Sequence, residues 1–182
     1  MNLKIILLFV LVVLSACSSS TSSLQENKPE IKLNNLICPQ VAILREAKEA
    51  LYYGNERITG AISDSESQPL LLKARMFKID GSCRYDKDGK DSGADIDFTI
   101  TSAAVREKAG ASQKFSLSYF VAVVDPVDEI IFRRLEKVTY KFSSKDRVTE
   151  AEDRIKLFIP IPEEKLAVGP GYRVLVGYKV EQ

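Results

Sequence analysis

The sequence predicts a mostly β protein, an antiparallel β-sandwich with at most one or two short helices, over residues 36–182. Several segments alternate apolar and polar side chains with the period of two typical of a half-buried strand, most clearly at 95–101. About seven such segments follow one another at hairpin spacing, with turn-forming residues between them. The length also fits one domain with an adequate core.

Residues 1–16 are predicted to be a signal peptide. One lysine, Lys4, precedes an apolar run over 5–14, which is shorter than the roughly 20 residues of a membrane-spanning helix. The next residues, Leu14-Ser15-Ala16-Cys17, resemble the lipobox of bacterial lipoproteins. That resemblance implies cleavage before Cys17 and its acylation, which would anchor the chain to the lipid bilayer of the cell envelope. The alternative is an ordinary cleaved signal with an incidental cysteine.

The residue after the cysteine refines the expected location. In the lipoproteins of Gram-negative bacteria an aspartate there favours the inner membrane, whereas this chain has Ser18. The resemblance therefore implies the outer membrane, facing the periplasm, although a Gram-positive host stays open. Residues 17–35 are predicted to be the lipidated cysteine and a disordered tether, because they are polar and rich in serine. As a flexible coil, this tether would have a root-mean-square end-to-end distance of roughly 23 Å.

The first elements of the domain are a strand, a helix and a loop. The stretch 36–44 predicts a strand, which Pro39 confines to an edge or a bulge. Residues 45–53 have helical propensity and an Arg45/Glu49 pair four residues apart, so a short helix is expected there. Residues 54–69 are expected to form an exposed loop.

Strand patterns dominate from Leu70 onward. The alternation changes phase, which predicts a bulge near Met76 after which Phe77, Ile79 and Cys83 point inward. The segment 115–124 becomes apolar on both faces and is predicted to be a central strand.

The C-terminal half continues this pattern. A turn at 125–129 leads into a strand over 130–142, where the charged stretch 133–137 suggests a second bulge. Residues 149–152 have the form of a capping box, but at most one helical turn fits before the next strand. Pro160 and Pro162 place that strand at a sheet edge. The last strand is expected over 173–180.

Two cysteines remain after Cys17. An exported chain with Cys38 and Cys83 favours a disulfide between them. The alternative is two buried thiols or a redox pair, which is less supported because the cysteines are not in a Cys-x-x-Cys arrangement.

Residues near the C-terminus carry a second resemblance. Leu166, followed by Gly169-Pro170-Gly171-Tyr172, is similar to the tyrosine corner of fibronectin type III and immunoglobulin-like domains. The match implies that the Tyr172 hydroxyl binds backbone near Leu166. A plain Pro-Gly turn is the alternative. The chain has no tryptophan and ends soon after Tyr172, so a permuted or shortened sandwich is expected, similar to small uncharacterised bacterial lipoproteins.

One dense carboxylate cluster is a candidate for metal binding. It contains Asp86, Asp88 and Asp91 around Gly89, and calcium requires several such oxygens. The spacing departs from the EF-hand template because Lys90 stands where a ligand is needed. A solvated hairpin tip is therefore the main interpretation, with a weak calcium site as the alternative.

The sequence gives little support to two enzymatic arrangements. Asp95 and Asp97 lie on one strand face, and glycosidases use two carboxyl groups about 5 to 9 Å apart beside a cleft. That face is predicted to be exposed, and no sequence feature predicts a cleft. Ser144-Lys145 lacks the Ser-x-x-Lys spacing of serine–lysine catalysis.

Composition narrows the function further. Lys+Arg number 26 and Asp+Glu 25, without a basic block, so no nucleic-acid partner is expected. The chain has no histidine, the commonest general base and metal ligand. No cofactor is expected. These exclusions favour a non-catalytic binding or assembly module that contacts an unknown envelope protein through an edge or loops. The alternative is a calcium- or carboxylate-dependent surface protein or hydrolase that uses 86–97.

Overall fold

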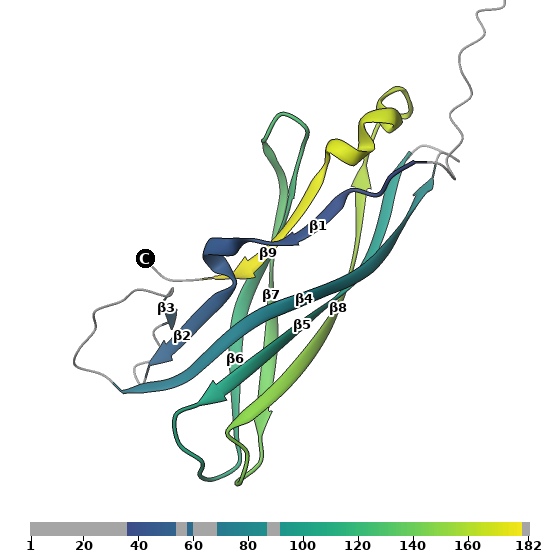
Figure 1. Ribbon diagram of the computed structural model, residues 1–182. Coiled ribbons are helices and arrows are strands. Elements are labelled where there is room, and N and C mark those ends of the chain that lie inside the picture. The colour runs from purple at the N-terminus through teal and green to yellow at the C-terminus, as the bar shows by residue number, and fades with distance from the viewer. Residues whose placement is uncertain (1–35, 54–57, 60–68, 87–91, 180–182) are drawn as a thin grey trace, which may run out of the picture. The chain divides into compact units, whose positions relative to one another are not determined.

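The computed structural model describes residues 36–53, 58–59, 69–86 and 92–179. Within these ranges the chain is mostly β and forms two sheets, which confirms the predicted fold class (Figure 1). The strands are β1 (Gln40–Ile43), β2 (Glu49–Tyr53), β3 (Ile58–Thr59), β4 (Leu70–Asp86), β5 (Gly93–Arg106), β6 (Gln113–Val124), β7 (Ile130–Phe142), β8 (Val148–Pro160) and β9 (Arg173–Tyr178). Two short 3-10 segments, η2 (Arg45–Ala47) and η3 (Glu163–Gly171), join them.

The two sheets have the orders β1-β9-β6-β7 and β3-β2-β4-β5-β8. Their facing sides form one apolar core, in which alternate residues of β5, β6, β8 and β9 are buried. The pairing of β1 with β9 is parallel, whereas the other described pairs are antiparallel. The first and last strands of the domain therefore lie side by side in one sheet.

Several predicted details are confirmed. The β4–β5 register shifts between Met76 and Lys78, where the change of phase predicted a bulge. Strand β6 is central in its sheet and its last four residues are buried. Strand β8 lies at a sheet edge, as Pro160 indicated. Strand β1, which follows Pro39 directly, is also an edge strand.

The helix expected at 45–53 is wrong. Helical hydrogen bonding is confined to the 3-10 turn η2, and 49–53 form strand β2. Pairing with β4 buries Ala50, and the Glu49 carboxylate makes cross-strand ion pairs with Lys73 and Arg75 at 3.3 and 3.8 Å. Tertiary packing has overridden the local helical propensity, because that preference is below about 1 kcal/mol per residue.

Two smaller expectations are also wrong, and the capping-box pattern at 149–152 forms no helical turn. Phe77 is the bulged residue of β4 and its side chain is exposed, because the bulge leaves it outside the ladder. The charged stretch 133–137 pairs regularly with β6, and the bulge lies instead at Ile131. Residues 149–152 are extended within β8, because their period-two pattern lets them pair with β5.

Two groups of polar side chains are buried in the domain. The hydroxyl of Tyr140 donates to the hydroxyl oxygen of Ser102 at 2.7 Å and is also hydrogen-bonded to the hydroxyl of Tyr178, which links both sheets. At the end of β5, the buried guanidinium of Arg106 donates to the carbonyl oxygens of Ala111, Ser143 and Asp146. Because polar groups lose water on burial, these hydrogen bonds are needed to hold them inside.

Candidate functional site

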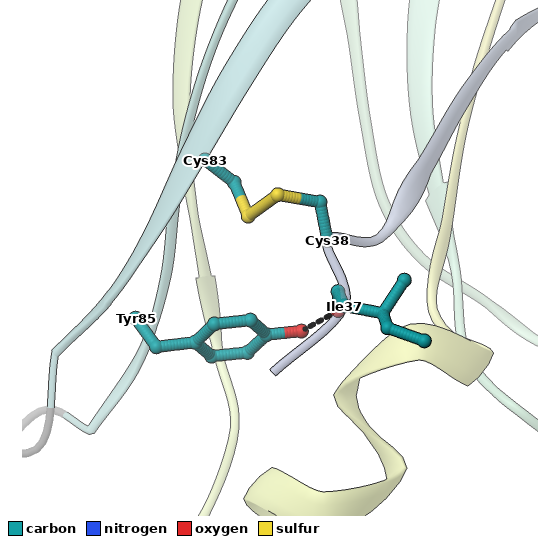
Figure 2. The surroundings of a disulfide bond; sticks show 4 residues. All are labelled: Ile37, Cys38, Cys83 and Tyr85. Carbon is teal, nitrogen blue, oxygen red and sulfur yellow. Dashed lines mark hydrogen bonds between the residues drawn. A yellow bond between two sulfur atoms is a disulfide. The ribbon is translucent and has the colours of Figure 1, made fainter. Parts of the chain in front are cut away.

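The disulfide joins the start of the domain to the second sheet. Cys38, just before β1, is bonded to Cys83 of β4, with Cα atoms 5.8 Å apart (Figure 2). The predicted pairing is therefore confirmed. Strand β1 contributes only four residues at the edge of its sheet, so the covalent bond fixes a segment that few backbone hydrogen bonds hold.

A tyrosine supports the same attachment. The hydroxyl of Tyr85, on β4, donates to the carbonyl oxygen of Ile37 at 2.9 Å (Figure 2). Its ring packs against Gly169 of η3, where a Cβ atom would lie 2.8 Å from the ring. Burial raises the pKa of the Tyr85 hydroxyl, so this donor stays protonated at neutral pH. Residue 37, β4 and η3 are thus held together.

A hollow of about 590 Å³ lies across three strands of the larger sheet. It follows two cross-strand rows, one of Ser82, Asp97 and Lys156 and the other of Arg84, Asp95 and Phe158. Between these rows lie Cys83, Ile96 and Leu157, whose alternation directs them toward the other side of the sheet. The hollow is therefore on the outer face of the β4–β5–β8 sheet.

The aromatic side of the hollow is positioned by a glycine. A Cβ atom at Gly93 would lie 2.5 Å from the Phe158 ring, so the absence of a side chain allows the ring to lie against β5. The Phe158 side chain is 40% exposed. The ring is therefore a fixed, partly exposed aromatic surface beside charged groups. Such a combination is typical of binding surfaces and not of a closed core.

The carboxylates of the hollow are ion-paired. Arg84 donates to Asp95 at 3.2 Å. Arg154 donates two hydrogen bonds to Asp97, at 2.7 and 2.6 Å, and Lys156 lies 3.7 Å from the same carboxylate. The hydrogen bonds and charge of Arg154 hold the pKa of Asp97 below its ordinary value. This carboxyl group is therefore ionised at neutral pH and is not a proton donor.

Comparison of the chain with protein-family models, with curated proteins and with solved structures finds no match.

The predicted metal cluster lies partly outside those residues. Asp86 ends β4, whereas Asp88 and Asp91 fall outside the described ranges. In the part of the chain that the structure describes, no group of three or more metal-ligating side chains comes together. Asp95 and Asp97 point away from the core and bind arginines of β4 and β8. Ser144 and Lys145 lie in the turn between β7 and β8.

Tyr172 directly follows η3, and its side chain is buried. Its backbone N–H donates to the carbonyl oxygen of Gly169 at 3.0 Å. No hydrogen bond joins its hydroxyl to the described backbone near Leu166, so the defining contact of the tyrosine corner is not formed there. The tyrosine whose hydroxyl binds a distant backbone carbonyl is instead Tyr85.

The lipidation residue Cys17 and the predicted tether 17–35 fall outside the described residues. Among the helices that the structure describes, none has the length and apolar character needed to cross a membrane. The hollow itself was missed by sequence reasoning, because its two rows come from strands far apart in the chain. The alternation at 95–97 indicated that Asp95 and Asp97 face outward. Only the register of β4, β5 and β8 shows which residues of the other two strands lie beside them.

Proposed function

We propose that this chain is a lipid-anchored lipoprotein of the cell envelope whose domain is a non-catalytic protein-binding module. The lipobox-like residues before Cys17 support the anchor. The observation that carries the binding role is the outer-face hollow, where Phe158 lies beside paired charges. Protein interfaces typically combine an aromatic anchor with a polar rim in this way.

The state of the carboxylates favours binding over hydrolysis. A glycosidase needs one carboxyl group that stays protonated near neutral pH, usually because its surroundings raise its pKa. In the hollow, Arg154 has the opposite effect on Asp97. The neighbouring carboxylate, Asp95, is engaged by Arg84. These paired groups can instead exchange partners with charges of another protein as it docks.

Photo-crosslinking in intact cells tests the binding role. A photoreactive amino acid placed at Ser82, which lines the hollow, is expected to give a discrete adduct with one envelope protein. Phe158→Ala should weaken this adduct severalfold. Phe77→Ala is the matched control, because Phe77 is 49% exposed on β4 and does not line the hollow. Absence of a protein adduct, or equal loss in both variants, would overturn the binding role.

The anchor has its own test. The mature chain is expected to begin at Cys17 and to carry acyl chains, as measured by mass spectrometry of its N-terminal peptide. Cys17→Ala should release the chain from the membrane fraction. An unmodified N-terminal peptide in the wild-type protein would contradict the anchor without bearing on the hollow.

A further inference from the structure

The exposed apolar side chains are unevenly distributed over the domain. Ile37, Val127 and Ile130 are 74%, 73% and 64% exposed, which is high for large apolar residues. Further exposed members of the same group are Ile131, Phe132 and Val168. They belong to the segment before β1, to the β6–β7 hairpin and to η3, which all lie at one end of the two sheets (Figure 1).

Packing contacts connect these three segments into one surface, here called the attachment end. Ile37 is held by Tyr85, and the ring of Tyr85 packs against Gly169 of η3. Two residues later, a Cβ atom at Gly171 would lie 3.1 Å from the ring of Pro126, which is in the β6–β7 turn. The attachment end therefore consists of Ile37, η3 and residues 126–132.

The hairpin holds its apolar side chains outward in a defined turn. The Asp125 carboxylate accepts hydrogen bonds from the backbone N–H groups of Val127 and Glu129, at 3.0 and 2.9 Å. Asp128 adopts a φ of 69° and pairs with Arg173 of β9. An Asx turn of this kind fixes the backbone, so the exposure of Val127 and Ile130 is a property of the fold.

The place where the predicted tether would join the domain indicates what covers this surface. The described chain begins at Leu36, one residue before Ile37, and the tether predicted from the sequence separates it from Cys17 by about 18 residues, with a span of roughly 23 Å. An acylated Cys17 would therefore keep the attachment end close to the bilayer. Such tethering raises the local concentration of lipid, so that even a weak apolar contact is occupied.

The charges at this end favour apolar insertion over attraction to anionic headgroups. Acidic residues Asp125 and Asp128 are engaged in the turn and with Arg173. Exposed groups of both signs, including Glu129 and Arg133, surround the tip. A mixed surface gives little long-range attraction to either sign of membrane charge, so binding should depend only slightly on salt.

We propose that the attachment end is a lipid-contacting surface that rests on the bilayer holding the acylated cysteine. This inference depends on the proposed lipidation of Cys17. The domain then stands with the β6–β7 turn and η3 against the lipid. The outer-face hollow, on the side of the larger sheet, remains open to a protein.

The absence of tryptophan from the chain provides the test. Val127→Trp introduces a single tryptophan at the hairpin tip, and Val148→Trp is the matched control at the other end of the sheets, where Val148 is also exposed. Each variant, expressed from the full sequence and purified from the cells, is reconstituted into phosphatidylcholine vesicles with brominated acyl chains. The tryptophan at 127 should emit at shorter wavelength and be quenched severalfold, with little dependence on salt, and the tryptophan at 148 should be unaffected.

The outcomes separate this inference from the function on which it rests. If the chain does not float with the vesicles, the anchor is wrong and the lipid contact falls with it, whereas the binding role of the hollow is unaffected. If it floats but the tryptophan at 127 is quenched no more than that at 148, only the lipid contact is overturned. A protein adduct from a photoreactive residue at Val127 in cells, together with an unquenched tryptophan, would show that a protein covers this end instead.

Discussion

The attachment end and the opposite end of the sandwich are closed by different chemistry. At the attachment end a disulfide and the Tyr85 hydroxyl fasten the first residues, and large apolar side chains remain in solvent. At the opposite end, the Arg106 guanidinium lies over the ring of Phe142 and binds the loops after β5 and β7 through their carbonyl oxygens.

This difference supports the proposed lipid contact at the attachment end. The carbonyl oxygens that Arg106 gathers are satisfied within the protein. The apolar residues of the attachment end gain nothing from water, and exposed apolar groups of this extent usually mark an interaction surface.

Removal of the disulfide should have the largest effect on stability. The cysteines are separated by 45 positions, and closing a loop of this length stabilises the folded state by about 4 kcal/mol in the chain-entropy model. Cys38→Ser with Cys83→Ser should lower the free energy of unfolding by about this amount in urea denaturation. A loss below about 1 kcal/mol would mean that β1 is held by its other contacts alone.

Arg106→Met should be the next most damaging change. It removes the charged donor of the hydrogen bonds to carbonyl oxygens of the two loops, at a cost of about 3 kcal/mol. Arg84→Met is the matched control, since Arg84 is exposed and its ion pair contributes below about 1 kcal/mol. Equal destabilisation of the two variants, measured by urea denaturation, would contradict the role of Arg106 in holding the loops after β5 and β7.

Alkaline pH should destabilise the core that joins the two ends. Burial raises the pKa of Tyr140 and Tyr178 above the ordinary value of 10.0. The folded chain therefore keeps these protons to higher pH than the unfolded chain. This contribution to stability is fully present below about pH 10 and is lost as the pH rises above it.

Tyr178→Phe tests that pH dependence. The free energy of unfolding should fall less steeply above pH 10 in this variant than in the wild type, because one of the buried hydroxyl groups is gone. Tyr172→Phe serves as the control, since Tyr172 lies outside the Tyr140–Tyr178 hydrogen bond. Unchanged slopes in Tyr178→Phe would show that these hydroxyl groups do not set the alkaline limit.

Tyr85→Phe should have the smallest effect on stability, and this effect should be confined to the attachment end. The change removes the hydrogen bond to Ile37 and should cost about 1 kcal/mol. Hydrogen exchange should show faster opening of β1, with the amides near Arg106 unchanged. Uniform acceleration over the whole domain would contradict a local role for Tyr85.

Much of the fold was predictable from the sequence because strand alternation is local. The pattern at 95–101 and the change of phase at Met76 locate β5 and the bulge of β4 directly. The pairing of Cys38 with Cys83 followed from their being the two cysteines left after Cys17. Strand β2 could not be predicted, because its extended form depends on β4, and the isolated segment favours a helix.

The candidate sites were less accessible from the sequence. Phe158 looked like an ordinary alternating residue, and its role depends on the distant Gly93 and on the register of β5 and β8. Similarly, Ile130 and Phe132 are residue types that are usually buried in a strand. Their exposure follows from the bulge at Ile131 and from their place on an edge strand, which no local pattern reveals.

The most direct test of the account compares crosslinks from two positions in living cells. A photoreactive residue at Val127 should give lipid adducts and little protein, whereas one at Ser82 should give an adduct with one envelope protein. Protein adducts at Val127 and none at Ser82 would contradict the account, because they would reverse the assigned roles of the attachment end and the hollow.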